Sequence, residues 1–208
     1  MKNWIFFGLV CATSAAWSAQ EVDLGCKHLR VVLDGRLSAD VVEREWGSGN
    51  ARSEVPATLE LLGCEGQLLD RLILGGPLAR IDSVPVRGAP NPTYLVSADL
   101  TAEAGSYNGP LTIPIQVVHN HLFEAVARFS HRRVEPIRLT LTGKSAWKRV
   151  SSRNADEMLL VSCQPRGKGF VTFYRRYFPL RQEWKVKVLA RKGLWESDGE
   201  FPSRKLFP

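Results

Sequence analysis

Short runs of alternating apolar and polar residues, separated by glycine, proline and asparagine, constrain the fold of this chain most. Residues 57–61 place Ala57, Leu59 and Leu61 on one side and Thr58 and Glu60 on the other. Period-two alternation is typical of strands with one buried face, and the chain's 12 prolines disfavour long helices. We therefore predict an all-β or β-dominated α+β fold, an antiparallel sandwich or open barrel of roughly nine to eleven short strands.

One segment, 38–46 (SADVVEREW), has the features of a short helix. Ser38 can cap its N-terminus, and Gly47 can end it. Val42 and Trp46 are four residues apart and would share one side. We expect one short helix here and strands elsewhere.

The first 19 residues are typical of a secretory signal peptide. Lys2 precedes an apolar run from Trp4 to Cys11, and Ala16-Trp17-Ser18-Ala19 fits the small-x-small cleavage pattern. We expect cleavage after Ala19, no transmembrane segment afterwards, and a single β-rich globular domain over 20–208. This predicts a periplasmic or secreted protein.

Three cysteines remain after removal of Cys11 with this segment: Cys26, Cys64 and Cys163. In an oxidising compartment they favour one disulfide and one thiol, with three possible pairings. Cys26 and Cys64 close the shortest loop and are the preferred pair. Cys163 shares a strand face with Leu159 and Val161, which favours a buried thiol.

Charge is distributed unevenly along the chain. Residues 20–127 carry 8 Lys and Arg against 14 Asp and Glu, whereas residues 128–208 carry 19 against 7. The balances are 8 − 14 = −6 and 19 − 7 = +12. This asymmetry indicates an anionic partner for the C-terminal half. The alternative is that the two halves neutralise each other within one fold.

The stretch 170–188 (FVTFYRRYFPLRQEWKVKV) combines aromatic residues with cations. Alternation in its second part places Trp184 in the core and Lys185 and Lys187 on the surface. Its first part has aromatics on both faces and one arginine on each. Arg175 and Arg176 therefore need either internal carboxylates or a bound anion as partners. Nucleic acid is not expected as the partner outside the cytoplasm.

His119 and His121 flank Asn120 and are the residues that most resemble metal ligands. Histidines at i and i+2 in a strand point the same way, but a usual zinc site has three or four ligands. A third would have to come from His28, His131 or a carboxylate. The apolar pairs on either side favour a hairpin tip instead. They are weak metal candidates, and we expect no metal and no cofactor.

The loop 104–110 (AGSYNGP) contains Ser106 and an Asn-Gly pair between two predicted strands. Asn-Gly is a strong turn signal, and the segment lacks the Gly-x-Ser-x-Gly pattern of a nucleophile elbow. We predict a hairpin connection and no catalytic residue.

No motif in the sequence names a biochemical function, and no family resemblance is evident. We expect a non-enzymatic binding or accessory protein that recognises an anionic envelope component or a protein partner. The candidate residues are Arg175, Arg176, Lys185 and Lys187 on the C-terminal strands. One alternative is an envelope hydrolase with a site near Ser106 or His119/His121. Another is a periplasmic inhibitor or immunity-type protein that inserts a loop into its partner.

Overall fold

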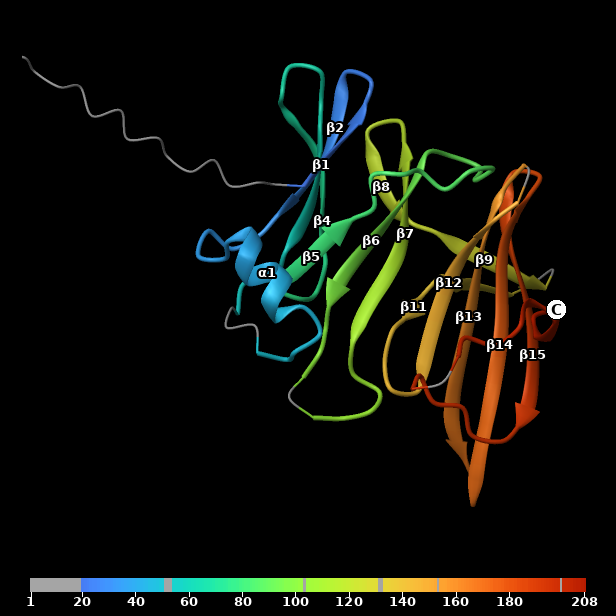
Figure 1. The fold of residues 1–208 in the computed structure, drawn as a ribbon. Helices are drawn as coiled ribbons and strands as arrows, with labels where there is room; N and C mark the ends of the chain where they lie inside the picture. The colour runs from blue at the N-terminus through green and yellow to red at the C-terminus, as the bar shows by residue number, and fades with distance from the viewer. Residues whose placement is uncertain (1–19, 51–53, 103, 131–132, 153, 199) are drawn as a thin grey trace, which may run out of the picture.

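The computed structural model describes residues 20–208 except 51–53, 103, 131–132, 153 and 199 (Figure 1). These residues form 15 strands, one α-helix and one 3-10 turn, so the expected β-dominated fold with one short helix is confirmed. The strands outnumber the nine to eleven expected, because several are too short to give an alternating pattern of their own. The expected signal peptide lies outside the described residues.

The strands form three sheets, which remain open, with free edges, in the described part of the chain. The N-terminal sheet has the order β1-β2-β3-β4, with β1 Glu21–Leu24, β2 Lys27–Val32, β3 Thr58–Leu62 and β4 Leu68–Ile73. The central sheet has the order β11-β7-β6-β5 with β8 beside β7, and comprises β5 Leu78–Ile81, β6 Thr93–Asp99, β7 Pro110–Val118, β8 His121–Glu124 and β11 Leu139–Thr140. The C-terminal sheet has the order β10-β9-β15-β14-β13-β12, with β9 Val126–Ser130, β10 Arg133–Pro136, β12 Ser145–Ser151, β13 Asp156–Arg166, β14 Gly169–Leu180 and β15 Glu183–Lys192.

The central sheet contributes to two cores. Tyr94 and Val96 of β6 pack with Leu29 and Leu59 of the N-terminal sheet. Leu95, whose side chain points the other way along the strand, belongs to the core that the central sheet shares with the C-terminal sheet. The central sheet thus packs against both other sheets, with one face of β6 in each core.

Residues 121–129, which look like one strand in the sequence, are two strands in different sheets. β8 pairs with β7 in the central sheet, whereas β9 pairs with β15 and β10 in the C-terminal sheet. Ala125 lies between them and is fully buried. Its N–H donates to Pro114 and its carbonyl accepts from Ile137, so the backbone stays satisfied where the chain changes sheet.

The expected helix is present as α1, Ala39–Glu45. The Ser38 hydroxyl accepts a hydrogen bond from the N–H of Val41, as predicted for its N-cap. Val42 is buried against Leu78 of β5. The apolar side of the helix therefore covers the edge of the central sheet.

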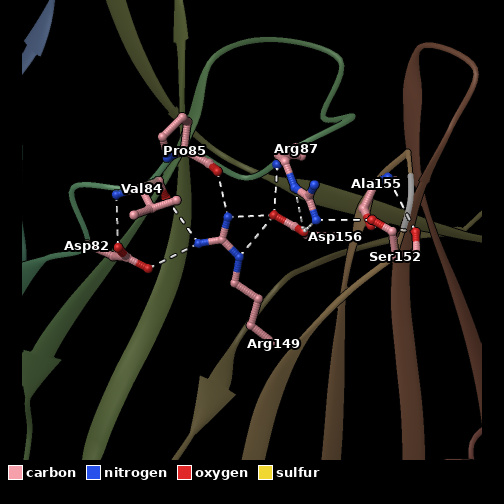
Figure 2. Close-up of polar contacts among 8 residues, drawn as sticks. All are labelled: Asp82, Val84, Pro85, Arg87, Arg149, Ser152, Ala155 and Asp156. Carbon is pink, nitrogen blue, oxygen red and sulfur yellow. Dashed lines mark hydrogen bonds and ion pairs between the residues drawn. The ribbon is translucent and has the colours of Figure 1, made fainter.

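A buried carboxylate, Asp156, fastens the β5–β6 loop to the C-terminal sheet (Figure 2). It accepts hydrogen bonds from the backbone N–H and guanidinium of Arg87 and from the guanidinium of Arg149. Arg149 also donates to Asp82 and to the carbonyls of Val84 and Pro85. The Arg149 guanidinium thus connects Asp156 to the β5–β6 loop, and Arg87 belongs to that loop itself. Burial alone would raise the pKa of Asp156, but the hydrogen bonds from Arg87 and Arg149 hold it well below its ordinary value.

The C-terminal tail covers part of the outer face of the C-terminal sheet. Phe207 is buried on Leu159 and Val161, and its ring meets Tyr174 edge to face. The 3-10 turn η1, Arg204–Leu206, lies just before it. Cys163 on the same face is buried and unpaired, as the sequence predicts.

The remaining two cysteines, Cys26 and Cys64, form a disulfide, which confirms the preferred pairing. The bridge connects the β1–β2 turn to the end of β3. Disulfides persist mainly in oxidising compartments, so this bond is consistent with a location outside the cytoplasm. Among the described residues, neither helical segment has the length and hydropathy needed to span a bilayer.

Candidate anion-binding surface

The four cations singled out from the sequence lie on two different faces of the C-terminal sheet. Antiparallel pairing places Arg176 opposite Lys187, on the outer face that the tail partly covers. Lys185 lies two residues from Lys187 and shares that face. Arg175 is opposite Val188 and lies on the inner face. The structure therefore brings three of the four together and separates Arg175 from them.

Arg176 has an internal partner. Its guanidinium makes two hydrogen bonds to Glu157, with nitrogen–oxygen distances of 2.9 and 2.5 Å. Arg204 of the tail donates to the same carboxylate at 2.8 Å. Burial alone would raise the pKa of Glu157, but the hydrogen bonds from Arg176 and Arg204 lower it overall. Glu157 thus joins β14 to the tail, and Arg176 also donates to the carbonyl of Pro208 at 3.4 Å.

Arg175 makes no ion pair with a carboxylate among the described residues. One guanidinium nitrogen donates to the hydroxyl of Ser162 at 2.9 Å, and the guanidinium carbon lies 5.0 Å from the centre of the Phe173 ring. A guanidinium presents five N–H donors, so most of its donors remain available to another acceptor.

Lys185 and Lys187 also differ in whether they have a carboxylate partner. Lys185 is paired with Glu183, which also accepts from Arg128. Hydrogen bonds from Arg128 and then Lys185 lower the pKa of Glu183 to about 2. Lys187 is exposed, and no ion pair joins it to a described carboxylate. Its ammonium group is therefore available to an anion from outside.

The free cations extend toward the β13–β14 turn. Residues 158–182 contain no aspartate or glutamate, nor do residues 184–195. Within these stretches, seven cations have no ion pair among the described residues, and all but the half-buried Arg175 are exposed. One of them, Arg181, lies in the β14–β15 turn, at the opposite end of these strands. We name the other six, which lie at the β13–β14 turn and on both faces of the paired strands, the distal basic surface: Arg166, Lys168, Arg175, Lys187, Arg191 and Lys192.

Sequence reasoning identified Arg175 and Lys187 but missed Arg166, Lys168, Arg191 and Lys192. The first two of these lie at the β13–β14 turn, and turns are ordinarily solvated. The signal that would have identified them is the absence of acidic residues over the paired strands.

The two candidate histidines lie in a hairpin, as the sequence predicts. His119 is in the β7–β8 turn, and Lys27 donates to its carbonyl and to the side chain of Asn120. His121 lies 3.5 Å from Asp70, whereas His28 is paired with Asp23. In the part of the chain that the structure describes, no three metal-ligating side chains are grouped to hold an ion. His131 lies outside that part.

Ser106 lies in the exposed connection between β6 and β7, as expected for a hairpin loop. The histidine pair is at the other end of β7, whose nine residues span roughly 26 Å at about 3.3 Å per residue. Ser106 and these histidines therefore do not form one nucleophile–base pair, which requires hydrogen-bonding contact.

Comparison with known proteins adds no information on function: no model of a known family, no curated protein and no solved structure matches the chain.

Proposed function

We propose that this chain is a non-enzymatic binding protein of an oxidising compartment, which recognises an anionic partner through the distal basic surface. The observation that carries the proposal is the difference in pairing among neighbouring cations. Arg176 and Lys185 have internal carboxylates, whereas Arg175 and Lys187, on the same two strands, have none among the described residues. Because these two cations make no ion pair with a described carboxylate, their charge is not neutralised by direct contact.

The pattern of ion pairs also argues against neutralisation of one half of the chain by the other. In the described residues, the ion pairs that cross residue 127 are Arg87–Asp156, Arg138–Glu124 and Arg149–Asp82. All three lie away from the distal basic surface. The cations of the distal basic surface are therefore not neutralised by described carboxylates of the N-terminal half.

Retention on immobilised heparin, used as a general polyanion, tests this proposal. We expect the variant Lys187→Glu/Arg191→Glu to elute at clearly lower salt than the wild type, because it reverses two exposed cations of the distal basic surface. The matched control is Lys148→Glu/Lys205→Glu, which makes the same change in net charge at two exposed lysines outside that surface.

Equal elution of the two double variants would contradict the proposal, since retention would then depend on total charge alone. Near-ultraviolet circular dichroism of both variants checks that the core around Trp184 is intact. All four substitutions are at exposed positions, so we expect changes in unfolding free energy of no more than about 0.5 kcal/mol each.

A further inference from the structure

The β13–β14 hairpin extends beyond its neighbours. β12 pairs with β13 only as far as Ser162, and β15 pairs with β14 only as far as Val171. The seven residues 164–170 are all exposed. Figure 1 shows this hairpin, in orange, reaching past β15 at the lower edge of the molecule. Its tip is thus free to touch an extended surface before other strands do.

The tip is both basic and apolar. Arg166 and Lys168 are exposed at the turn, and Lys192 lies beside them across from Val171. Pro165 and Phe170 are directly opposite each other in the ladder, and about a third of the Phe170 surface is exposed (36%). Arg166, Phe170 and Lys192 also line one shallow hollow at the base of the tip.

A second apolar residue lies next to this tip. The N–H of Gly193 donates to the carbonyl of Phe170 at 3.0 Å, and Leu194, which follows, is 52% exposed. Exposed apolar side chains surrounded by cations are suited to an interface that has anionic headgroups over hydrocarbon.

We propose that this hairpin tip docks on an anionic phospholipid surface, with Arg166, Lys168 and Lys192 on the phosphates and Phe170 inserted at the headgroup level. The inference rests on the proposed function and narrows its anionic partner to a membrane. A soluble polyanion is the weaker fit to the tip, because its cations are gathered at the end of a two-stranded ribbon and not along a groove that a polymer would follow.

Vesicle co-sedimentation tests the membrane contact. We expect the protein to bind vesicles of phosphatidylglycerol and phosphatidylcholine and not vesicles of phosphatidylcholine alone. In Arg166→Gln/Lys168→Gln, binding should fall about 25-fold, which is about fivefold for each neutralised cation. The control Lys148→Gln/Lys205→Gln makes the same charge change away from the tip and should bind like the wild type.

Phe170→Ala distinguishes docking with insertion from attraction by charge alone. We expect about tenfold weaker binding, as the loss of a partly inserted aromatic side chain implies, and the loss should persist at high salt because it does not depend on charge. An unchanged affinity for this variant would overturn the insertion of Phe170.

The outcomes separate this inference from the proposed function. Binding to heparin that depends on Lys187 and Arg191, without binding to anionic vesicles, would overturn the membrane contact and leave the proposed function standing. Vesicle binding that the tip variants do not weaken would overturn the role of the tip. Failure to bind both heparin and vesicles would overturn the two proposals together.

Discussion

The two ends of the C-terminal sheet contain similar numbers of cations but differ in their carboxylates. At the end where β13 begins and β14 ends, Asp156, Glu157 and Glu183 each accept hydrogen bonds from two or more cationic side chains. At the end with the β13–β14 turn, the strands contain no acidic residue. A cation with an internal carboxylate holds segments of the protein together, whereas one without it remains available to a ligand.

The largest effect on this comparison should come from removing the buried acid. Asp156→Ala leaves Arg149 and Arg87 without their shared acceptor, and Arg149 is largely buried, with 17% of its side chain exposed. Breaking a buried ion pair in this way typically costs about 3 to 5 kcal/mol. Urea denaturation should show a loss of this size. Stability within 1 kcal/mol of the wild type would mean that the β5–β6 loop is held by its apolar contacts alone.

Acid should reduce the stability of the protein through the carboxylates at this end of the sheet. The pKa values of Asp156, Glu157 and Glu183 are all lowered in the folded protein. Groups of this kind contribute stability above their unfolded pKa values, near 3.8 for aspartate and 4.5 for glutamate, and the contribution is lost as pH falls toward the folded values. The unfolding free energy should therefore decrease from about pH 5 downward.

The same urea titrations on Asp156→Asn test which group causes the acid effect. This variant has no carboxylate at position 156 to protonate, so its decrease between about pH 5 and pH 2 should be smaller than that of the wild type. Equal slopes in the two proteins would assign the effect to other carboxylates.

The smallest effect, and the sharpest comparison, comes from the adjacent arginines. Arg176→Gln removes the paired hydrogen bonds to Glu157 and should cost about 2 kcal/mol, the usual range for bonds to charged groups. Arg175→Gln removes one bond to a hydroxyl and should cost no more than about 1 kcal/mol. The order should reverse for heparin retention, where Arg175→Gln has the larger effect. If the two variants lost the same unfolding free energy and eluted from heparin at the same salt concentration, the distinction between structural and available cations would be removed.

The sequence predicted the elements that depend on local pattern. Alternation placed Trp184 in the core, where it is 2% exposed, and cap chemistry located α1. The Cys26–Cys64 pair followed from loop length. The first two depend on residues close together in the chain, and the disulfide required a choice among only three possible pairings.

Pairing between distant residues could not be predicted in the same way. Glu157 accepts from Arg204, which is 47 residues away, and nothing local marks either as a partner. The division of 121–129 between two sheets escaped prediction because the alternating pattern continues through Ala125. The free cations could be recognised only once the strand register showed which cations lie next to which carboxylates.

The order of strands in the C-terminal sheet has a consequence for how the chain folds. β12 to β15 form a meander of adjacent hairpins, whose contacts are local and form quickly. β9 joins this meander through a parallel pairing with β15, in which Ala127 lies opposite Trp184. That pairing closes a loop of more than fifty residues and carries the larger entropic cost. During synthesis, the N-terminal and central sheets can therefore assemble early, whereas β9 and β10 can join the C-terminal sheet only after β15 has been synthesised.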